Sequence, residues 1–420
     1  MVQGMVECLL PGGEALVRLT DGVLLAANGV PGDRVELEAS GRRRGAARGN
    51  IVRLLEASGM RVPADCAVAA DCGGCALQHV DAEAQADIKS GWVLKQFEPF
   101  MHPDSAWMPV QETPLFGMRR RARWHRGADA DGAFLGFHAR SSHRVVRTSA
   151  CPVVHPDMDT LRLALEPVLP PMIASVRMLR LFDGMHVVLE VAEGVSVAED
   201  VLEGCLAAMA GSGPTIQPWL RAGPVLRPLT RPVLTLHDRL PAGQDWVDLA
   251  VGPEDFVQGH AVGNEHILRQ IQAWAGTPRR IADLFCGIGN LSLPLAVSCG
   301  ASVQGADVAE SSISAARKNA KRLGIHAGFE ACNLFDGVRE GHYAGADVLL
   351  LDPPRKGAKA ICREMGRLLP GRIIMVNCDI AAGVRDAELL AAQGYRLHAL
   401  RALDIFPFSG HVEAMSCWQR

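Results

Sequence analysis

The stretch Ile281–Val297, IADLFCGIGNLSLPLAV, decides the fold of this chain. It opens with a short apolar run of the kind that forms a buried strand, and it closes with an apolar run suited to a helix. Between them, Gly287 and Gly289 let the backbone turn sharply and approach a ligand closely. Strand, glycine loop and helix in this order predict the first unit of a parallel, doubly wound α/β sheet.

The same alternation continues toward the end of the sequence. We expect strands at Ser302–Asp307, Ala346–Leu351 and Arg372–Asn377, and a helix over Ser311–Leu323. Ligands bind just beyond the carboxyl ends of the strands in such sheets. The residues that follow these strands are therefore the candidates for a site.

Two further sections precede this sheet. Residues 1–58 carry short strand-like runs separated by glycine and proline turns, which predicts a small β-barrel. Residues 59–250 combine a cysteine-rich stretch, a helical pattern over Ala82–Phe97 and several strand-like runs, so we expect a mixed α+β region. The predicted domains are 1–58, 59–250 and 251–420.

The composition is that of a globular protein. Its 420 residues are 48% hydrophobic, with no membrane-length apolar run and no secretion signal, so we expect a cytoplasmic protein without a membrane partner. There the 12 cysteines stay reduced, and their grouping indicates metal binding and catalysis. The net charge is only −3, but arginines gather at 42–48 and 119–126. That pattern fits a polyanion footprint as well as it fits a solvated surface.

The glycine loop favours a nucleoside cofactor. Asp307 ends the second strand, 24 residues after Asp283 (307 − 283 = 24), where an acidic residue can accept both hydroxyls of a ribose. Ser292 stands where dinucleotide-binding loops have a third glycine, and Asp283 can meet the ammonium of an amino-acid moiety. Both details favour S-adenosyl-L-methionine. The alternative is a tight β–α turn with no ligand.

A possible nucleophile lies at the rim of the same predicted pocket. Cys378 follows the strand Arg372–Asn377, and a thiolate there can add to a substrate base that faces a bound cofactor. The turn Asp352-Pro353-Pro354-Arg355 is rigid because proline fixes φ, and its arginine can favour the ionised thiol. Glu413, 35 residues after Cys378 (413 − 378 = 35), is the candidate base. An isolated cysteine is usually a small buried apolar residue. The prediction therefore depends on Cys378 occurring together with the Asp352–Arg355 turn and Glu413.

Four other cysteines form a separate group. Cys66, Cys72 and Cys75 are close in sequence, while Cys151 is remote and is followed by Pro152. Three close thiols and a remote one followed by proline favour a [4Fe–4S] cluster. A structural zinc site is the competing interpretation, although only one C-x-x-C half is present.

The chain resembles the bacterial RNA uracil-5 methyltransferases, most closely the 23S rRNA branch with an N-terminal TRAM barrel, which is OB-like, and an iron–sulfur cluster. The matching motifs cover nearly the whole chain: Val30–Val35, the four cysteines, Gly117–Arg123, Phe256–Gln258, Asp283–Asn290, Asp352–Gly357 and Asp404–Glu413. The resemblance implies a Rossmann-like class I methyltransferase sheet, S-adenosyl-L-methionine and a [4Fe–4S] cluster as cofactors, and an RNA substrate. It favours rRNA over tRNA and implies no obligate protein partner.

The resemblance also implies residue roles. Uracil C5 becomes nucleophilic only after a thiolate adds to C6, so Cys378 is similar to the family's nucleophile and Glu413 to the base that removes the C5 proton. The candidate cofactor-binding residues are Gln258, Asp283, Phe285, Gly287, Gly289, Asn290, Asp307, Asn333 and Asp352, and the candidate metal ligands are Cys66, Cys72, Cys75 and Cys151.

The chain departs from the family's pattern at three places. Gln258 is followed by Gly259-His260 where the family usually has valine and asparagine, and Asp307 stands where it often has Glu. Asn377-Cys378-Asp379-Ile380 stands where the family usually has S-C-N-P. Losing the proline and placing an acid beside the thiol is expected to raise its pKa. Three functions therefore stay open: methylation of uridine C5 in 23S rRNA, the same reaction on tRNA, and RNA binding without catalysis.

Overall fold

The C-terminal sheet has eight strands in the order β18-β17-β16-β19-β20-β22-β21-β6. The computed structural model describes residues 1–420 except 44, 112, 193, 196, 199 and 339–340. The predicted α/β sheet is confirmed in five parallel strands, of which β19 and β20 are the most apolar because both faces of the sheet are covered there. They are β16 (Arg280–Leu284), β17 (Ser302–Asp307), β18 (Ala327–Ala331), β19 (Val348–Leu351) and β20 (Arg372–Asn377).

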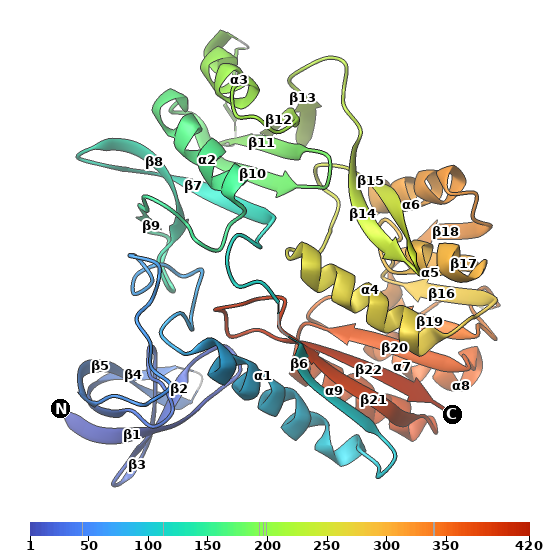
Figure 1. The fold of residues 1–420 in the computed structure, drawn as a ribbon, viewed down its shortest axis with the longest axis horizontal. Coiled ribbons are helices and arrows are strands. Elements are labelled where there is room, and N and C mark those ends of the chain that lie inside the picture. Colours follow the sequence, from blue (N-terminus) through green and yellow to red (C-terminus); the bar gives the residue numbers. More distant parts are fainter. Residues whose placement is uncertain (44, 112, 193, 196, 199, 339–340) are drawn as a thin grey trace.

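Helices cover both faces of this sheet (Figure 1). Ile281, Val303 and Leu350 pack against one helical layer, while Leu349 and Met375 pack against the other. The first layer contains α4 (Ala261–Ala275), α5 (Ser292–Cys299) and α6 (Glu310–Arg322). The second contains α1 (Ala82–Phe97), α7 (Lys359–Arg363), α8 (Met365–Leu368) and α9 (Ile380–Ala392).

The remaining strands of the sheet depart from a purely parallel order. β22 (Glu413–Gln419) runs antiparallel between β20 and β21 (Arg396–Leu403). At the edge, β6 (Ala106–Gln111) pairs in parallel with β21. The chain therefore contributes a strand to this sheet before it builds the central section.

The N-terminal section is a closed barrel, as predicted, in the order β1-β2-β3-β5-β4. Its interior is filled by alternating side chains such as Val6, Val17 and Leu37. The buried Asp33 carboxylate accepts the backbone N–H of Ser58 at 2.9 Å and fixes the following chain to the barrel. The strands are β1 (Val2–Leu9), β2 (Ala15–Leu19), β3 (Gly22–Ala26), β4 (Arg34–Arg43) and β5 (Ala46–Glu56).

The central section is a seven-stranded sheet with helices α2 (Pro156–Leu165) and α3 (Glu203–Ala210) packed on it. Its strands are β7 (Arg121–Asp129), β8 (Gly132–His138), β9 (Val145–Val146), β10 (Ile173–Arg180), β11 (Met185–Val191), β12 (Ile216–Ala222) and β13 (Val225–Pro228). The hairpin β14 (Leu236–Ala242) and β15 (Asp245–Val251) leads into the C-terminal section and packs with α4 and α5. The boundaries at residues 58 and 250 stay a prediction. Within the described chain, no helix has the length and apolar character needed to cross a membrane.

Candidate active site

A cavity of about 530 Å³ opens at the carboxyl ends of β16, β17, β19 and β20. We call it the carboxyl-edge cavity, and its size is usual for a small-molecule site. It brings together most of the residues that the sequence singled out, from both the cofactor set and the catalytic pair. Those in its wall are Gln258, Phe285, Gly287, Asp307, Asn333, Asp352, Cys378 and Glu413.

Three of the predicted cofactor-binding residues are not in this wall. Asp283 is fully buried beneath the glycine loop. A side chain at Gly289 would lie 2.6 Å from Leu293, so this glycine permits close packing of loop on helix. Asn290 exchanges two side-chain hydrogen bonds with Asn264 of α4, at 3.0 and 3.1 Å. All three support the loop, and their role as direct cofactor contacts stays a prediction.

The loop that faces the cavity has an unusual backbone. Phe285 has φ of +70°, in the left-handed region that a side chain rarely adopts, and Gly287 has φ of +52°. Strain of this kind persists where the surrounding structure enforces it and is common at ligand sites. The Asp307 carboxylate holds the turn, because it accepts the backbone N–H groups of Gly287 and Ala309, each at 3.0 Å.

Apolar side chains at the mouth were missed by the sequence reasoning. Phe335 is 44% exposed and Val308 71% exposed, and both line the carboxyl-edge cavity together with Phe406 and His411. The rings of Phe335 and Phe285 lie 5.9 Å apart. The sequence could have indicated Val308, because this residue directly follows the strand that ends in Asp307. Exposed apolar surface of this kind favours a flat, apolar ligand group such as a nucleobase.

Two acids in the cavity wall have raised pKa values. Glu413 is 2% exposed, and its Oε2 atom has no hydrogen-bond partner among the described residues. Burial and the charge of Asp352 raise the pKa of Glu413 well above its usual range, and Arg355 opposes the shift. Burial likewise raises the pKa of Asp352 to about 7, although Gln258 donates a hydrogen bond to it at 3.3 Å. Both acids would be stabilised in their ionised form by a cationic ligand.

A third acid lies directly behind the loop. Burial, with a contribution from Asp307, raises the pKa of Asp283 to about 7. Ser292 opposes this shift, although its hydroxyl makes no hydrogen bond of good geometry with the carboxylate. Three acidic groups, Glu413, Asp352 and Asp283, thus lie in or directly behind the cavity wall. Arg355 is the positive side chain that lowers the pKa of Glu413, and it does not balance all three charges.

Cys378 is half-buried just after β20 and faces the same cavity. Burial raises the pKa of Cys378 to about 11, and the charges of Glu413 and Asp352 add to the rise. Arg355 lowers this pKa, as the sequence suggested. The sequence suggested the neighbouring Asp379 as a cause, and the structure gives this residue a different contact. Its carboxylate accepts the backbone N–H of Ala382 at 2.8 Å and caps the start of α9.

The segment 404–412 places Glu413 and is held from outside the C-terminal sheet. Phe408 has φ of +60°, and its carbonyl accepts the backbone N–H groups of Ala76 and Leu77 at 2.7 and 2.8 Å. The carbonyl of Gly410 accepts the N–H of Gly12 in the barrel at 2.8 Å. The barrel and the cysteine-rich stretch thus both contact the segment that leads into Glu413.

A buried ion pair fixes the start of this segment to α1. The Lys89 ammonium donates to Asp404 at 2.6 Å and to the carbonyl of Phe406 at 3.2 Å. The Lys89 side chain is fully buried, and that of Asp404 is 9% exposed.

Replacing Lys89 by methionine is expected to lower the free energy of unfolding by about 3–5 kcal/mol, because it leaves the Asp404 carboxylate buried and unpaired. Urea denaturation would measure the loss. Arg18→Met, which removes the exposed ion pair to Glu7, is the matched control and should cost less than about 1 kcal/mol. Equal stability of K89M and the wild-type protein would contradict this prediction.

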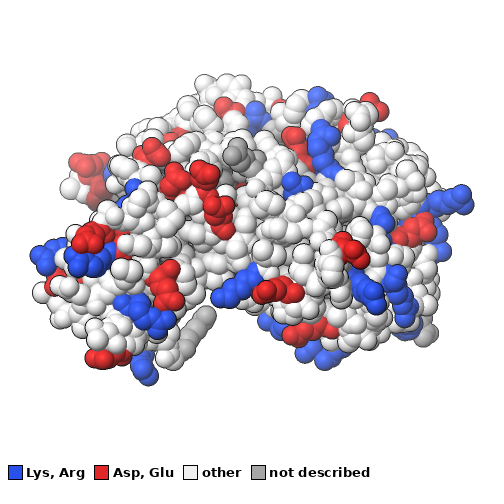
Figure 2. Space-filling view, turned by 60° about the horizontal axis from the view of Figure 1, so that its bottom comes forward, with Lys and Arg blue, Asp and Glu red and all other residues white. Residues whose placement is uncertain are grey.

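The predicted basic cluster at 119–126 does not form an open patch. Arg120 is buried and pairs with Asp238 at 2.6 Å, and Arg123 pairs with Glu190 at 2.7 Å. Arg126 donates to the carbonyl of Leu169 at 3.0 Å. Figure 2 shows acidic and basic side chains interspersed over one face of the molecule. In the cluster at 42–48, Arg48 pairs with Glu14, and residue 44 lies outside the described residues.

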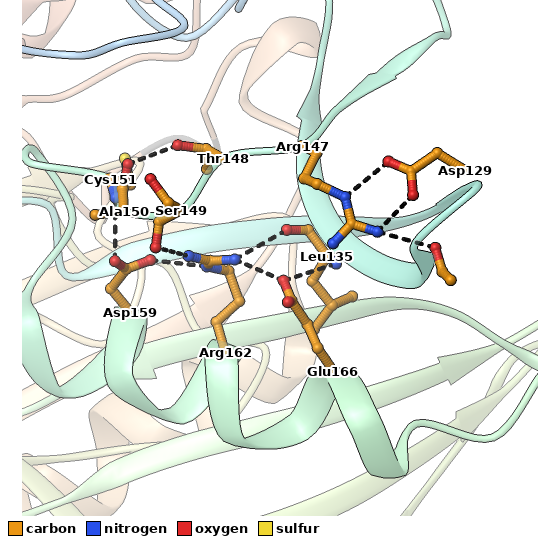
Figure 3. A network of polar contacts seen from close by, with 11 residues as sticks. Asp129, Leu135, Arg147, Thr148, Ser149, Ala150, Cys151, Asp159, Arg162 and Glu166 are labelled. Carbon is orange, nitrogen blue, oxygen red and sulfur yellow. Dashed lines mark hydrogen bonds and ion pairs between the residues drawn. The ribbon is translucent and has the colours of Figure 1, made fainter.

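The four cysteines of the predicted metal site, Cys66, Cys72, Cys75 and Cys151, line one small enclosed cavity together with Arg119. Figure 3 shows how the remote cysteine is held. The N–H of Cys151 donates to Asp159 at 3.0 Å, and the fully buried Arg162 donates to Asp159 at 2.7 Å and to the carbonyl of Ser149 at 3.3 Å. Burial raises the pKa of Cys151 to about 11. As placed, no group of three or more His, Cys, Asp or Glu side chains in the described part of the chain could hold a metal ion.

Comparisons with known proteins agree with this architecture. Residues 260–369 match the family model of the methyltransferase small domain. A tRNA (uracil-54, C5)-methyltransferase from Pyrococcus abyssi, solved in complex with S-adenosyl-L-homocysteine, has the same fold over 99% of both chains, with a TM-score of 0.74 and 20% identity. The fold and the cavity define a class I methyltransferase.

Curated relatives name the family more closely. The chain is 34% identical to the 23S rRNA (uracil(1939)-C(5))-methyltransferase RlmD of Pseudomonas aeruginosa, over 99% of this chain and 93% of that protein. It is 31% identical to the protein of the same name from Aromatoleum aromaticum, over the full length of both. The chain belongs to the RlmD family of RNA uracil-C5 methyltransferases.

Proposed function

We propose that this protein methylates C5 of a uridine in 23S rRNA with S-adenosyl-L-methionine as the methyl donor. One observation carries the proposal: a single cavity joins the glycine loop and Asp307 to Cys378 and Glu413. An RNA-binding protein without catalysis has no use for a thiol and an acid beside a cofactor loop. The names of the RlmD relatives support the choice of rRNA.

The residues present fit the proposed cofactor. Asp283, Asp352 and Glu413 have raised pKa values, and neither Asp283 nor Glu413 Oε2 has a hydrogen-bond partner of good geometry among the described residues. A ligand that carries a sulfonium and an ammonium supplies the missing positive charge. Asp307 and Gly287 would hold the ribose side, and the exposed Phe335 would contact the adenine.

When bound, S-adenosyl-L-methionine supplies an electrophilic methyl group. The Cys378 thiolate adds to uracil C6, and the electron pair of the C5–C6 double bond moves toward C4–O as an enolate. C5 then forms a bond to the methyl carbon while the bond from that carbon to sulfur breaks and leaves its electron pair on sulfur. Glu413 as carboxylate then removes the C5 proton. The electrons of that C–H bond restore the double bond and expel the thiolate, and the proton on Glu413 passes to solvent. Arg355 favours the ionised states of both side chains.

Cofactor affinity is expected to fall as the pH is lowered through 7. The pKa of Asp352 is about 7 in the free protein, and a bound cation favours the ionised carboxylate. Below this pKa the group must first lose a proton, so the Kd should rise about tenfold per pH unit for one such group. Calorimetric titration with S-adenosyl-L-methionine between pH 8 and 5.5 measures this. Asp352→Asn should make the dependence on pH less steep, and a Kd that is independent of pH in the wild-type protein would contradict the assignment.

Methylation of 23S rRNA fragments and of tRNA, analysed side by side by mass spectrometry, tests the substrate. Methyl transfer to uridine C5 in rRNA alone supports the proposal, and transfer to tRNA alone overturns it. The presence of the barrel does not distinguish rRNA enzymes from tRNA enzymes. The fold of the tRNA enzyme from Pyrococcus abyssi matches 99% of this chain, and this share includes the barrel. RNA that contains 5-fluorouridine tests the third possibility. A covalent adduct excludes a protein that only binds RNA.

We further propose that Cys66, Cys72, Cys75 and Cys151 hold a [4Fe–4S] cluster. The four thiols surround one enclosed cavity, as the ligands of such a cluster would. Arg119 in the wall of this cavity offsets the negative charge of the cluster. The spacing of the cysteines, with only one C-x-x-C half and a remote cysteine followed by proline, favours a cluster over zinc. Protein purified without oxygen should contain about four iron and four sulfide per chain, and Cys151→Ser should lose most of both. Zinc in stoichiometric amount would overturn the assignment.

A further inference from the structure

Exposed aromatic side chains gather at two places in this protein. Among the described residues, five aromatic side chains are largely exposed, and all five line one of two cavities. Phe256 and Phe335 belong to the carboxyl-edge cavity. The other three are Phe116, Phe182 and Trp246, which are 44%, 53% and 46% exposed. Core packing does not explain a second cavity that concentrates exposed aromatic surface, because packing would bury these rings.

The second cavity has a volume of about 550 Å³ and lies between the central section and the start of α4. We call it the junction cavity. Arginines stack on its aromatic walls: the Arg239 guanidinium lies 3.8 Å from the ring centre of Phe182, and that of Arg269 lies 5.6 Å from the ring of Trp246. Arg239 is held in place by a two-fold ion pair to Asp248. Flat aromatic and guanidinium surfaces of this kind bind unstacked nucleobases.

The inner wall of the junction cavity has unpaired polar atoms. Arg120 and Asp238 line it, are 5% and 3% exposed, and pair with each other at 2.6 Å. Nevertheless, Nη2 of Arg120 and Oδ2 of Asp238 have no hydrogen-bond partner among the described residues. Both atoms are enclosed, so this ion pair forms a rigid polar floor beneath the aromatic walls and does not contact a ligand directly.

The junction cavity is a direct neighbour of the carboxyl-edge cavity. Gln258 lines the carboxyl-edge cavity, and its carbonyl accepts a hydrogen bond from Nε of Arg120 at 2.8 Å. On the other side, the ring of Phe116 lies 5.2 Å from that of Phe408, whose segment also carries Phe406 into the carboxyl-edge cavity. The walls of the two cavities are therefore in direct contact.

We propose that the junction cavity binds a second, unpaired base of the RNA substrate, close in sequence to the target uridine; the proposal rests on the proposed function. The base stacks against the aromatic and guanidinium surfaces of Phe182, Trp246 and Arg239. Sequence preference then comes from a base that is never modified, and the RNA must open at two positions to bind.

The test is the affinity of a fluorescent 23S rRNA fragment for the double variant Phe182→Ala/Trp246→Ala. Each lost stacking contact should raise the Kd about 5- to 150-fold. Leu163→Ala, which removes an exposed apolar side chain from α2 away from both cavities, is the matched control and should leave the Kd unchanged. Binding of S-adenosyl-L-homocysteine, measured by calorimetry, shows that the double variant keeps its fold and its cofactor site.

A second measurement identifies the base. Each nucleotide near the target is replaced in turn by an abasic residue, and the Kd is measured with wild-type protein and with the double variant. One position should weaken wild-type binding and have little further effect on the variant, since both changes remove the same contact. Unchanged affinity of the double variant, or no abasic position that couples to it, would overturn the inference while leaving the proposed function standing. A wild-type protein that binds RNA through these residues without methylating it would overturn only the proposed function.

Discussion

Replacing Cys378 by alanine is expected to lower the rate of methyl transfer by about three orders of magnitude or more, because loss of the nucleophile removes the only route by which C5 becomes reactive. RNA affinity should change little, since Cys378 is half-buried and is one contact among many. Transfer of a radioactive methyl group to RNA under single-turnover conditions measures the chemical step.

The matched control for this experiment is Cys8→Ala, which removes an exposed thiol of the barrel and should keep wild-type activity. A C378A rate within tenfold of the wild-type rate would overturn the covalent mechanism. In the free wild-type protein, alkylation of Cys378 should be slow at pH 7 and speed up with pH, because its pKa is about 11.

Replacing Glu413 by glutamine is expected to stop the reaction after methyl transfer. The amide keeps the shape of the side chain but cannot remove the C5 proton, so turnover should fall by about 10²–10⁴. The enzyme should then accumulate as a covalent complex with methylated RNA, visible as a labelled band of reduced mobility on a denaturing gel. The double variant C378A/E413Q should give no such band.

The fold of the E413Q variant is expected to be intact. Burial raises the pKa of Glu413 in the folded protein, so ionising this group costs stability once the pH exceeds its ordinary unfolded value. Glutamine removes that cost, and the variant should unfold at an equal or higher urea concentration than the wild-type protein at pH 8. Free turnover by E413Q without an adduct would show that another group removes the proton.

Local patterns in the sequence predicted the α/β sheet. They also predicted that Cys378 and Glu413 lie in the same site. This worked because the carboxyl ends of neighbouring parallel strands meet at one edge, so residues far apart in sequence share a cavity. The insertion of β22 between β20 and β21 was not predictable in this way, because no local signal specifies which strand becomes the neighbour of another. The same holds for β6, which joins the sheet from residues 106–111.

Charged residues were the least predictable feature. In the sequence, the arginines at 119–126 resemble a site for a polyanion. In the folded protein, Arg120 forms an ion pair with Asp238, and Arg123 forms one with Glu190. Asp379 was assigned an effect on the thiol beside it, whereas its carboxylate caps a helix. No sequence motif marks the junction cavity, because its lining comes from six separated stretches of the chain, and none of its aromatic residues stands out alone.

The segment that leads into Glu413 also determines the order in which the protein can assemble. Its partner Lys89 lies 315 residues before Asp404, and Gly12 lies 398 residues before Gly410 (410 − 12 = 398). Contacts of such long sequence separation form late in folding, because the loops that they close lose the most chain entropy. We therefore expect refolded protein to regain its secondary structure well before its activity. Intermediates with the barrel undocked would carry a nearly complete sheet with a mispositioned base, and they would be unable to complete a catalytic cycle on RNA.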